Sequence, residues 1–205
     1  MSIKIAVPTE TRALEKRVAL VPSVLEKLSK WGCEVTLQQN AGALTRIPDT
    51  SYTSAKGAAA VSTSTGYANS DIVVKIQPPT IDEVKQMKPG SVLICFVYAH
   101  REPELVKALR DQKITCFAME LVPRTTRGQA MDALSSQAAL AGYYGALLGA
   151  TNLARILPMM TTAVGSIRPA KVLVMGAGVA GLQAIATSRR LGAMVEGYDV
   201  RSATK

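Results

Sequence analysis

The chain has 205 residues, of which 48% are hydrophobic and 19% are charged, so a packed core is expected and wholesale disorder is excluded. The formal net charge is +9, but the 24 basic residues form no block of five and divide evenly, twelve in residues 1–102 and twelve in residues 103–205, and only 4% of residues are aromatic. This distribution argues against a nucleic-acid partner. No apolar run approaches the roughly 18 residues of a membrane helix, and the N-terminus lacks a leader pattern. We therefore expect a soluble, cytoplasmic protein that does not itself insert into a membrane.

The three cysteines, Cys33, Cys95 and Cys116, are odd in number and lack the spacing of metal ligands. They lie in apolar, strand-like runs, which favours buried thiols in a reducing compartment. We expect neither a disulfide nor a metal site.

Short strand-like runs alternate with helical runs from the start of the chain, as in a doubly wound parallel sheet. The expected strands are 3–7, 34–37, 58–61, 71–76, 91–97 and 114–119. The expected helices are 22–30, 50–57, a brief one after Thr80, and 103–111. Thr80 and Glu83 have the spacing of a capping box.

The pattern changes after Val122. Residues 123–129 are polar and loop-like, and a long helix rich in small residues is expected from Met131 to about Leu157, ended by Pro158. Its low charge predicts packing on both sides. The sequence thus predicts an N-terminal Rossmann-like domain (1–125), followed by a connecting helix and the start of a second domain (126–205).

A dinucleotide-binding motif opens that second domain. An apolar strand (171–175) precedes Gly176, Gly178 and Gly181, and a helix (179–191) and a strand (193–198) follow. Asp199 stands 18 residues after Gly181, near the ~20 typical of a Rossmann fingerprint. A glycine turn without a ligand is the alternative, but four features in the right order favour a nucleotide.

Each part of the motif has a physical task. Gly176 permits the tight turn, Gly178 lets the backbone approach a pyrophosphate, and Gly181 lets helix and strand pack closely. The helix start, with Val179 and Ala180, offers N–H groups to phosphate. Asp199 can accept hydrogen bonds from the adenosine ribose and would repel a 2′-phosphate, which favours NAD(H). Arg201 weakens that inference, because a nearby arginine can accommodate such a phosphate. Val200 lies between the two and is included in the predicted site.

The segment 119–138, MELVPRTTRGQAMDALSSQA, resembles a motif of the NAD(H)-binding component of proton-translocating nicotinamide nucleotide transhydrogenases. The resemblance extends over the chain through KIAVPTE, RVALVP, VVKIQPP, GAGVAGLQAIAT and YDVRSATK. It implies that Arg124, Gln129, Asp132 and Ser135 surround the nicotinamide end of NAD(H), and that Val179 and Asp199 contact the pyrophosphate turn and the adenosine ribose. Without the resemblance, the first four would be a polar loop and the cap of the following helix.

The resemblance also implies partners. Hydride would pass directly to NADP(H) on a partner domain, and a membrane-spanning domain would couple the transfer to proton translocation. A homodimer is implied, peripheral on the cytoplasmic face of the inner membrane or on the matrix side in an organelle.

Two other functions remain open. Arg17, Lys75 and His100 fall where alanine dehydrogenases, which resemble the same architecture, place a substrate-carboxylate arginine, a pyruvate-binding lysine and a catalytic histidine. Against this function, segment 123–137 is unlike theirs, and His100 precedes a charged helix start. A non-catalytic nucleotide-binding module is the third possibility.

The fold class expected is α/β, with two doubly wound, Rossmann-like domains, the second present only as its first β-α-β unit. We therefore expect a fragment or one half of a split polypeptide. Its last sheet should have an unpaired edge and an uncovered apolar face, and the chain alone should bind NAD(H) weakly.

Overall fold

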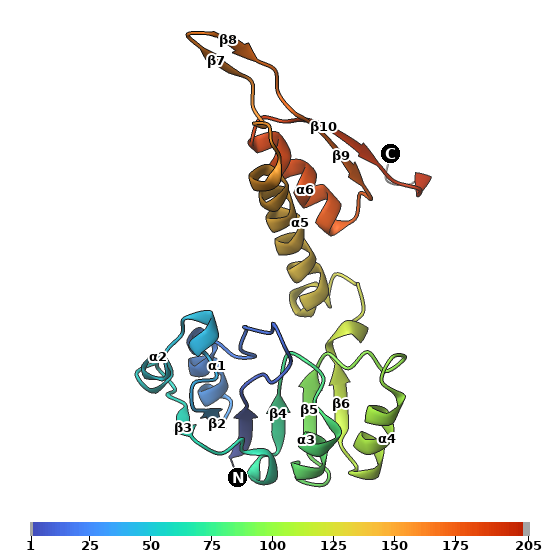
Figure 1. The fold of residues 1–205 in the computed structure, drawn as a ribbon. Coiled ribbons are helices and arrows are strands. Elements are labelled where there is room, and N and C mark those ends of the chain that lie inside the picture. Colours follow the sequence, from blue (N-terminus) through green and yellow to red (C-terminus); the bar gives the residue numbers. More distant parts are fainter. Residues whose placement is uncertain (1, 203–205) are drawn as a thin grey trace. The chain divides into compact units, whose positions relative to one another are not determined.

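The computed structural model describes residues 2–202, which form an α/β structure (Figure 1). The chain divides into two compact units, Met1–Met131 and Asp132–Lys205. The domain boundary expected near residue 125 stays a prediction.

The first unit is built on a six-stranded parallel sheet, which confirms the doubly wound architecture. Its strands are β1 (Ile3–Val7), β2 (Cys33–Gln38), β3 (Ala60–Ser62), β4 (Ile72–Val74), β5 (Val92–Cys95) and β6 (Thr115–Ala118). Their order in the sheet is β3-β2-β1-β4-β5-β6. The strand order therefore reverses between β1 and β4, and the crevice outside the carboxyl ends of these two strands is where such folds bind ligands.

The strands are connected by helices α1 (Leu25–Lys30), α2 (Asp49–Thr53), α3 (Ile81–Gln86) and α4 (Pro103–Asp111) and by the 3-10 turns η1 (Pro22–Val24), η2 (Ala43–Thr45) and η3 (Tyr67–Asn69). Two further 3-10 turns, η4 (Met119–Leu121) and η5 (Gln129–Met131), follow β6. The helix expected from Pro22 thus begins as a 3-10 turn, and only α4 keeps its expected bounds. The predicted capping box is present. The Glu83 backbone N–H donates to Thr80 Oγ1 (3.2 Å), and the Thr80 N–H donates to Glu83 Oε2 (2.7 Å).

The core of this unit lies on both faces of the sheet, as a buried parallel sheet requires. Successive side chains of β1 point to opposite faces, so Ile5 and Val7 join one cluster and Ala6 joins the other. The first cluster is closed by Leu25 and Tyr52, and the second is closed by residues of α3 and α4. Both clusters fix the strands whose carboxyl ends carry the polar residues discussed below.

The second unit contains α5 (Ala133–Asn152), β7 (Met160–Thr162), β8 (Gly165–Ile167), β9 (Lys171–Met175), α6 (Val179–Arg190) and β10 (Met194–Tyr198). Strands β9 and β10 pair in parallel and α6 connects them, so the predicted β-α-β unit is present. Two expectations were wrong. Helix α5 ends at Asn152, before Pro158, because Leu153 turns to an extended conformation. The segment between Pro158 and Pro169, for which a linker without strands was expected, contains an antiparallel hairpin, β7–β8.

Helix α5 packs against α6 through its small residues. Gly142 is the buried residue of α5, and a Cβ there would collide with the carbonyl oxygen of Ala180. Four of the large side chains of α5 are between 44% and 59% exposed, namely Leu140, Tyr143, Tyr144 and Leu148, whereas Leu134 and Leu147 are half-buried. Within the described part of this unit, packing on both sides of the helix, as predicted, is therefore not observed.

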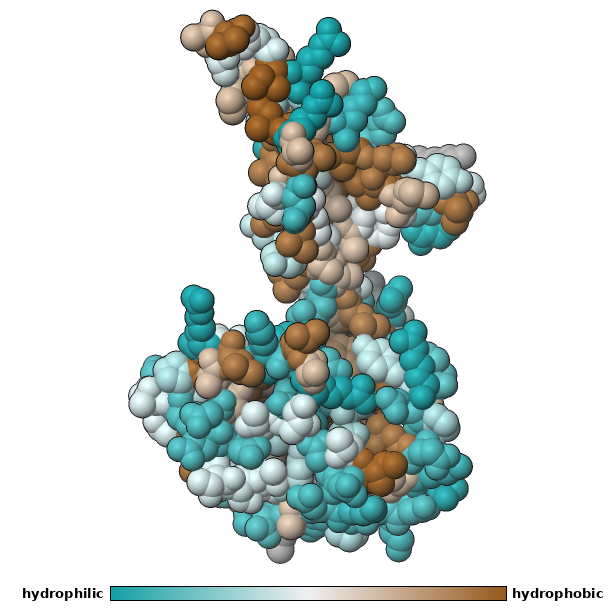
Figure 2. Space-filling model, in the orientation of Figure 1, coloured by the Kyte–Doolittle hydropathy of each residue, from teal (hydrophilic) through white to brown (hydrophobic). Residues whose placement is uncertain are grey.

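The sheet of the second unit also has apolar side chains at its surface. Leu173, Met175, Met194 and Tyr198 are all more than half exposed, and Figure 2 shows much of this unit's surface in brown. These side chains form the uncovered apolar face expected for this sheet. Within residues 2–202, β9 and β10 pair only with each other, as an unpaired edge requires.

The three cysteines are free thiols: Cys95 is buried, whereas Cys33 and Cys116 are half-buried. Residues 2–202 include no group of three or more His, Cys, Asp or Glu side chains placed to hold a metal ion. In the same residues, no helix combines the length and the apolar character needed to cross a membrane.

Candidate functional site

The glycine motif lies in the loop between β9 and α6. Gly176 has φ +104°, a left-handed conformation that favours glycine, and its N–H donates to the Tyr198 carbonyl (2.6 Å). A Cβ on Gly181 would collide with the Gly176 carbonyl oxygen, so this glycine permits the close approach of loop and helix. Both tasks expected of these glycines therefore have a geometric basis.

Gly178 faces open space, as Gly176 does, but it has no left-handed backbone conformation. It is the N-cap residue of α6, and a Cβ there would meet nothing within 4 Å. Val179 and Ala180 follow in the first turn of α6, where backbone N–H groups have no partner within the helix. An open loop before such a helix start fits a pyrophosphate, which needs room and N–H donors.

Asp199 lies at the end of β10, beside this loop. Its Oδ2 accepts a hydrogen bond from the Ala177 N–H (2.7 Å), and the Asp199 side chain is only 7% exposed. Arg201 donates to the same carboxylate from its backbone N–H (2.8 Å), its Nε (3.0 Å) and its Nη2 (3.0 Å). These bonds from Arg201 and Ala177 hold the pKa of the Asp199 carboxyl well below its ordinary value. The carboxylate is therefore ionised and links β10 to the glycine loop. Val200, between the two, is largely exposed.

The four residues expected at the nicotinamide lie on either side of the division between the two units. Arg124 and Gln129 are exposed in the first unit, with Gln129 at the start of η5. Asp132 is the N-cap of α5. Its Oδ1 accepts from the Ser135 N–H (2.9 Å), and its Oδ2 accepts from the Ser135 hydroxyl (2.6 Å). The helix-cap interpretation therefore describes Asp132 and Ser135, and a role of all four at the nicotinamide stays a prediction.

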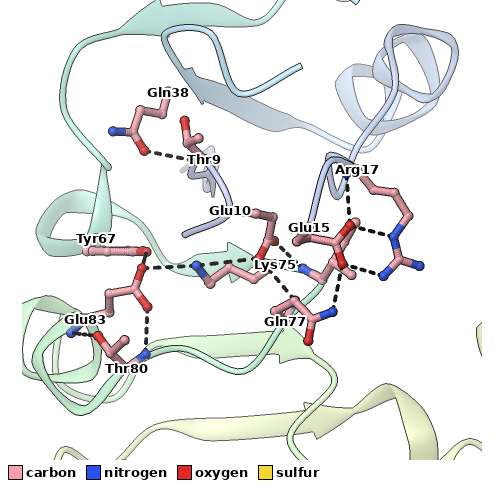
Figure 3. A network of polar contacts seen from close by, with 11 residues as sticks. Thr9, Glu10, Glu15, Arg17, Gln38, Tyr67, Lys75, Gln77, Thr80 and Glu83 are labelled. Atoms are coloured by element: carbon pink, nitrogen blue, oxygen red, sulfur yellow. Dashed lines mark hydrogen bonds and ion pairs between the residues drawn. The ribbon is translucent and has the colours of Figure 1, made fainter. Parts of the chain in front are cut away.

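A second polar group lies in the first unit, at the switch point between β1 and β4 (Figure 3). The Lys75 side chain, directly after β4, is 1% exposed, and its Nζ lies 3.1 Å from Glu83 Oε1 and 3.9 Å from Glu10 Oε2. The Tyr67 hydroxyl donates to the same Glu83 oxygen (2.9 Å). The lysine is thus enclosed by carboxylates of this chain.

Arg17 is paired in the same way. Its Nε and Nη2 donate to the two oxygens of Glu15 (2.8 and 2.6 Å), and Gln77 Nε2 donates to Glu15 as well (2.7 Å). The bond from Arg17 is the main reason why the pKa of Glu15 is lowered to about 2. Both basic residues that an alanine dehydrogenase would use for its substrate are therefore paired with carboxylates of the same chain.

Burial and hydrogen bonding have opposite effects on Glu83. Burial alone would raise its pKa, but the N–H of Thr80, the ammonium of Lys75 and the hydroxyl of Tyr67 together outweigh burial and lower the pKa. Burial also raises the pKa of Tyr67, so this phenol stays protonated and donates. The network is therefore a cluster of charged and polar groups that have hydrogen-bond or ion-pair partners within the chain.

Internal carboxylates also bind the backbone at the carboxyl ends of two strands. Glu10 accepts from the N–H groups of Ile76 (2.6 Å) and Gln77 (3.2 Å) after β4. Glu120 accepts from those of Val97 and Tyr98 after β5, the shortest bond being 2.6 Å. Amides that could bind a substrate carboxylate are thus already occupied. His100 is exposed in the turn at 99–101, and among residues 2–202 no hydrogen bond joins it to this network.

Two family models match successive regions of the chain. The model described as "Alanine dehydrogenase/PNT, N-terminal domain" matches residues 6–141, and "Alanine dehydrogenase/PNT, C-terminal domain" matches residues 145–205. The first model alone covers more than half of the chain.

The chain belongs to the alanine dehydrogenase/PNT family.

Individual members of the alanine dehydrogenase/PNT family differ in their similarity to the chain. The chain is 48% identical over 208 residues to an NAD(P) transhydrogenase alpha-subunit polypeptide of Rhodospirillum rubrum, and the match covers 99% of this chain and 54% of that protein. It is 31% identical over 202 residues to the alanine dehydrogenase of Mycobacterium tuberculosis, covering 97% and 54%. The crystal structure of a transhydrogenase from Sinorhizobium meliloti matches with a TM-score of 0.94 and 43% identity, covering 98% and 60%.

These similarities confirm the resemblance inferred from segment 119–138 and place alanine dehydrogenase as a more distant member of the family. The chain spans about half the length of the curated family members that it matches.

Sequence reasoning missed the carboxylates that neutralise Lys75 and Arg17. Glu10 follows the end of β1 by three residues, and Lys75 directly follows β4. In a doubly wound sheet these two strands are neighbours, so an acid after one and a lysine after the other are expected to meet. That signal was available for Glu10, whereas the pairing of Glu15 with Arg17 depends on loop geometry.

Proposed function

We propose that this chain is the NAD(H)-binding component of a proton-translocating transhydrogenase. The observation that carries the proposal is a glycine loop with open space beside Gly178 and the ionised Asp199 bonded to its backbone, in a chain 48% identical to a transhydrogenase alpha subunit. The neutralised Lys75 and Arg17 argue against an alanine dehydrogenase, since that reaction needs basic groups free to bind a 2-oxo acid.

The residues of the loop would hold the nucleotide by its phosphates and its adenosine. Gly178 leaves room for the pyrophosphate, and the N–H groups at the start of α6, at Val179 and Ala180, would donate to it. Asp199 would accept from the ribose hydroxyls, and its charge would favour NAD(H) over NADP(H). The nicotinamide ring itself carries the hydride, so the protein's task is binding and orientation.

Orientation at the nicotinamide end is assigned to Arg124, Gln129, Asp132 and Ser135. An arginine, an amide and a hydroxyl can hold the carboxamide and the nicotinamide ribose, which fixes the ring for transfer. No acid or base is required, because hydride passes directly between two nicotinamides.

The partners proposed are an NADP(H)-binding domain and a membrane-spanning proton-channel domain, with the chain as a homodimer. The chain would lie at the cytoplasmic face of an inner membrane, or at the matrix side in an organelle. Its positive charge of +9 suits an acidic partner surface.

One assay separates the candidate functions. The chain, combined with its NADP(H)-binding and membrane partners, should transfer hydride between NADH and an NADP analogue. Pyruvate- and ammonia-dependent oxidation of NADH would instead identify an alanine dehydrogenase. Binding of NADH with neither activity would identify a nucleotide-binding module.

A glycine substitution tests the binding site directly. In Gly178→Ala the added Cβ meets no protein atom within 4 Å, so the fold should keep its stability. The methyl group would nevertheless occupy the space assigned to the pyrophosphate, and NADH affinity should fall about tenfold, equivalent to about 1.4 kcal/mol. Gly145→Ala, on an open face of α5, is the control and should bind NADH as the wild type does. Unchanged affinity in Gly178→Ala would contradict the proposed site.

A further inference from the structure

The carboxylate of Asp199 is already saturated with hydrogen bonds. It accepts one from the Ala177 N–H and three from Arg201, and a carboxylate has about four lone-pair positions. Two of the bonds from Arg201 come from its guanidinium, which reaches both oxygens. The Asp199 side chain is almost fully enclosed, whereas that of Arg201 is 60% exposed. The arginine is therefore the partner that can move.

The adenosine ribose would require the same two oxygens. Its neighbouring hydroxyls donate to an acidic residue at this position in dinucleotide-binding folds, and the proposed function assigns that task to Asp199. The Ala177 N–H belongs to the glycine loop and is fixed by it, so the guanidinium of Arg201 competes with the ribose. When nucleotide binds, the guanidinium has to leave at least one oxygen while staying tethered two residues away.

We propose that Arg201 is a specificity-determining residue that weakens the preference of this site for NAD(H) over NADP(H). Paired with Asp199, its guanidinium cancels the negative charge that would repel a 2′-phosphate. Once the ribose has displaced it from Asp199, the planar guanidinium remains beside the 2′ position of the adenosine ribose. There it can form paired hydrogen bonds with a phosphate, which suits it better than a hydroxyl. The inference rests on the proposed function, because it needs a nucleotide at the glycine loop.

The test compares the ratio of the dissociation constants for NADPH and NADH in the full chain, measured by the fluorescence of the bound nucleotides. Arg201→Gln should raise this ratio about tenfold, because Asp199 is left uncompensated and the phosphate partner is lost. Arg201→Lys, which keeps the charge but loses the planar fork, should give a ratio between those of the wild type and Arg201→Gln. Asp199→Asn should lower the ratio.

Arg190→Gln is the matched control, since it removes the same charge from an exposed position at the far end of α6. Its ratio should equal that of the wild type. A rise as large as in Arg201→Gln would show a general charge effect and overturn the inference. Circular dichroism would establish that each variant keeps the wild-type fold.

A second readout needs no nucleotide. Carbon-13 NMR titration of the Asp199 carboxyl should give a pKa well below the ordinary aspartate value in the wild type and a higher one in Arg201→Gln. An unchanged Asp199 titration would contradict the ion pair and overturn the inference. If both nucleotides bind and the ratio of their dissociation constants is the same in the wild type and in Arg201→Gln, the inference is overturned and the proposed function is not. Binding of neither nucleotide at millimolar concentration would overturn the proposed function, and the inference with it.

Discussion

Lys75 and Arg17 carry positive charges at the end of the first sheet where a ligand would be expected, and both are paired with carboxylates of the same chain. The two pairs differ in exposure, since the Lys75 side chain is 1% exposed and that of Arg17 is 40% exposed. A buried ion costs several kcal/mol to desolvate, so its partners are needed for the fold itself. The function of Lys75 at residue scale is therefore to hold Glu10 and Glu83 in place and to help lower the pKa of Glu83.

Replacing this lysine tests that function. Lys75→Met should lower the free energy of unfolding at pH 7 by about 3 kcal/mol, because two buried carboxylates lose their counter-charge. Lys85→Met removes a lysine of α3 whose side chain is 69% exposed, and it should cost less than about 0.5 kcal/mol. Urea unfolding of both variants gives the comparison. Equal effects would show that the buried network contributes no more than a surface pair.

The effect of Lys75→Met should also depend on pH. The folded pKa of Glu83 lies below its ordinary value of 4.5, so the stability that the charged carboxylate contributes is present above pH 4.5. That contribution is lost as the pH falls through the lower folded pKa. The difference between wild type and Lys75→Met should therefore shrink below pH 4.5, and a constant difference from pH 7 to pH 3.5 would contradict this linkage.

At the scale of elements, the contact between α5 and α6 is set by one glycine. The Gly142→Ala substitution would place a methyl group against the backbone carbonyl of Ala180, which cannot move without displacing the first turn of α6. Gly145 and Gly149 lie on the same helix with nothing within 4 Å of a Cβ. The three positions share one helix propensity and differ in their surroundings.

Alanine substitutions at these glycines should therefore have opposite signs. Gly145→Ala and Gly149→Ala should stabilise the second unit by roughly 0.5–1 kcal/mol each, since alanine favours the helix. Gly142→Ala should destabilise it by about 1–3 kcal/mol, the usual cost of overpacking. Thermal unfolding followed by circular dichroism measures all three. Stabilisation by Gly142→Ala would mean that the two helices do not pack as closely as described.

The elements that sequence predicted well are those with their own local signals. Thr80 and Glu83 specify a helix start by side-chain chemistry, and Pro103 specifies another by its fixed φ. The motif from Gly176 to Asp199 was also predictable, because its glycine spacing is set by the turn between strand and helix. The end of α5 was misplaced because Asn152 and Leu153 carry no strong stop signal, whereas Pro158 does. The β7–β8 hairpin was missed because its strands have three residues each and little alternation.

The candidate site was predictable only in part, for a related reason. The glycine loop is contiguous in sequence, so the positions of Gly178 and Asp199 could be expected. The contact of Lys75 with Glu10 joins residues far apart in the chain and depends on which strands become neighbours. The two hydrogen bonds from the Arg201 guanidinium to Asp199 join residues that are close in sequence. They depend on the side-chain rotamers, which residue spacing does not reveal.

At the scale of the whole chain, the two units differ in how much apolar surface they bury. Of the buried hydrophobic residues among residues 2–202, only Leu157 and Ala170 belong to the second unit, and all others belong to the first. Local stability follows the density of buried apolar contacts. The unit that carries the glycine loop should therefore open more readily than the unit that carries the buried ion network.

Hydrogen exchange measures this contrast. Backbone amides of β1, β4 and β5 should be protected far longer than those of β9 and β10, by a factor of about 100 or more if their opening free energies differ by roughly 3 kcal/mol. NADH should slow exchange in β9, α6 and β10, because a ligand that binds only the folded unit stabilises it in proportion to RT ln(1 + [L]/Kd). The strands of the first unit should change little, and they serve as the internal control. Equal protection of both units without nucleotide would contradict the contrast in burial. Protection by NADH confined to β1 and β4 would instead place the nucleotide at the switch point of the first sheet.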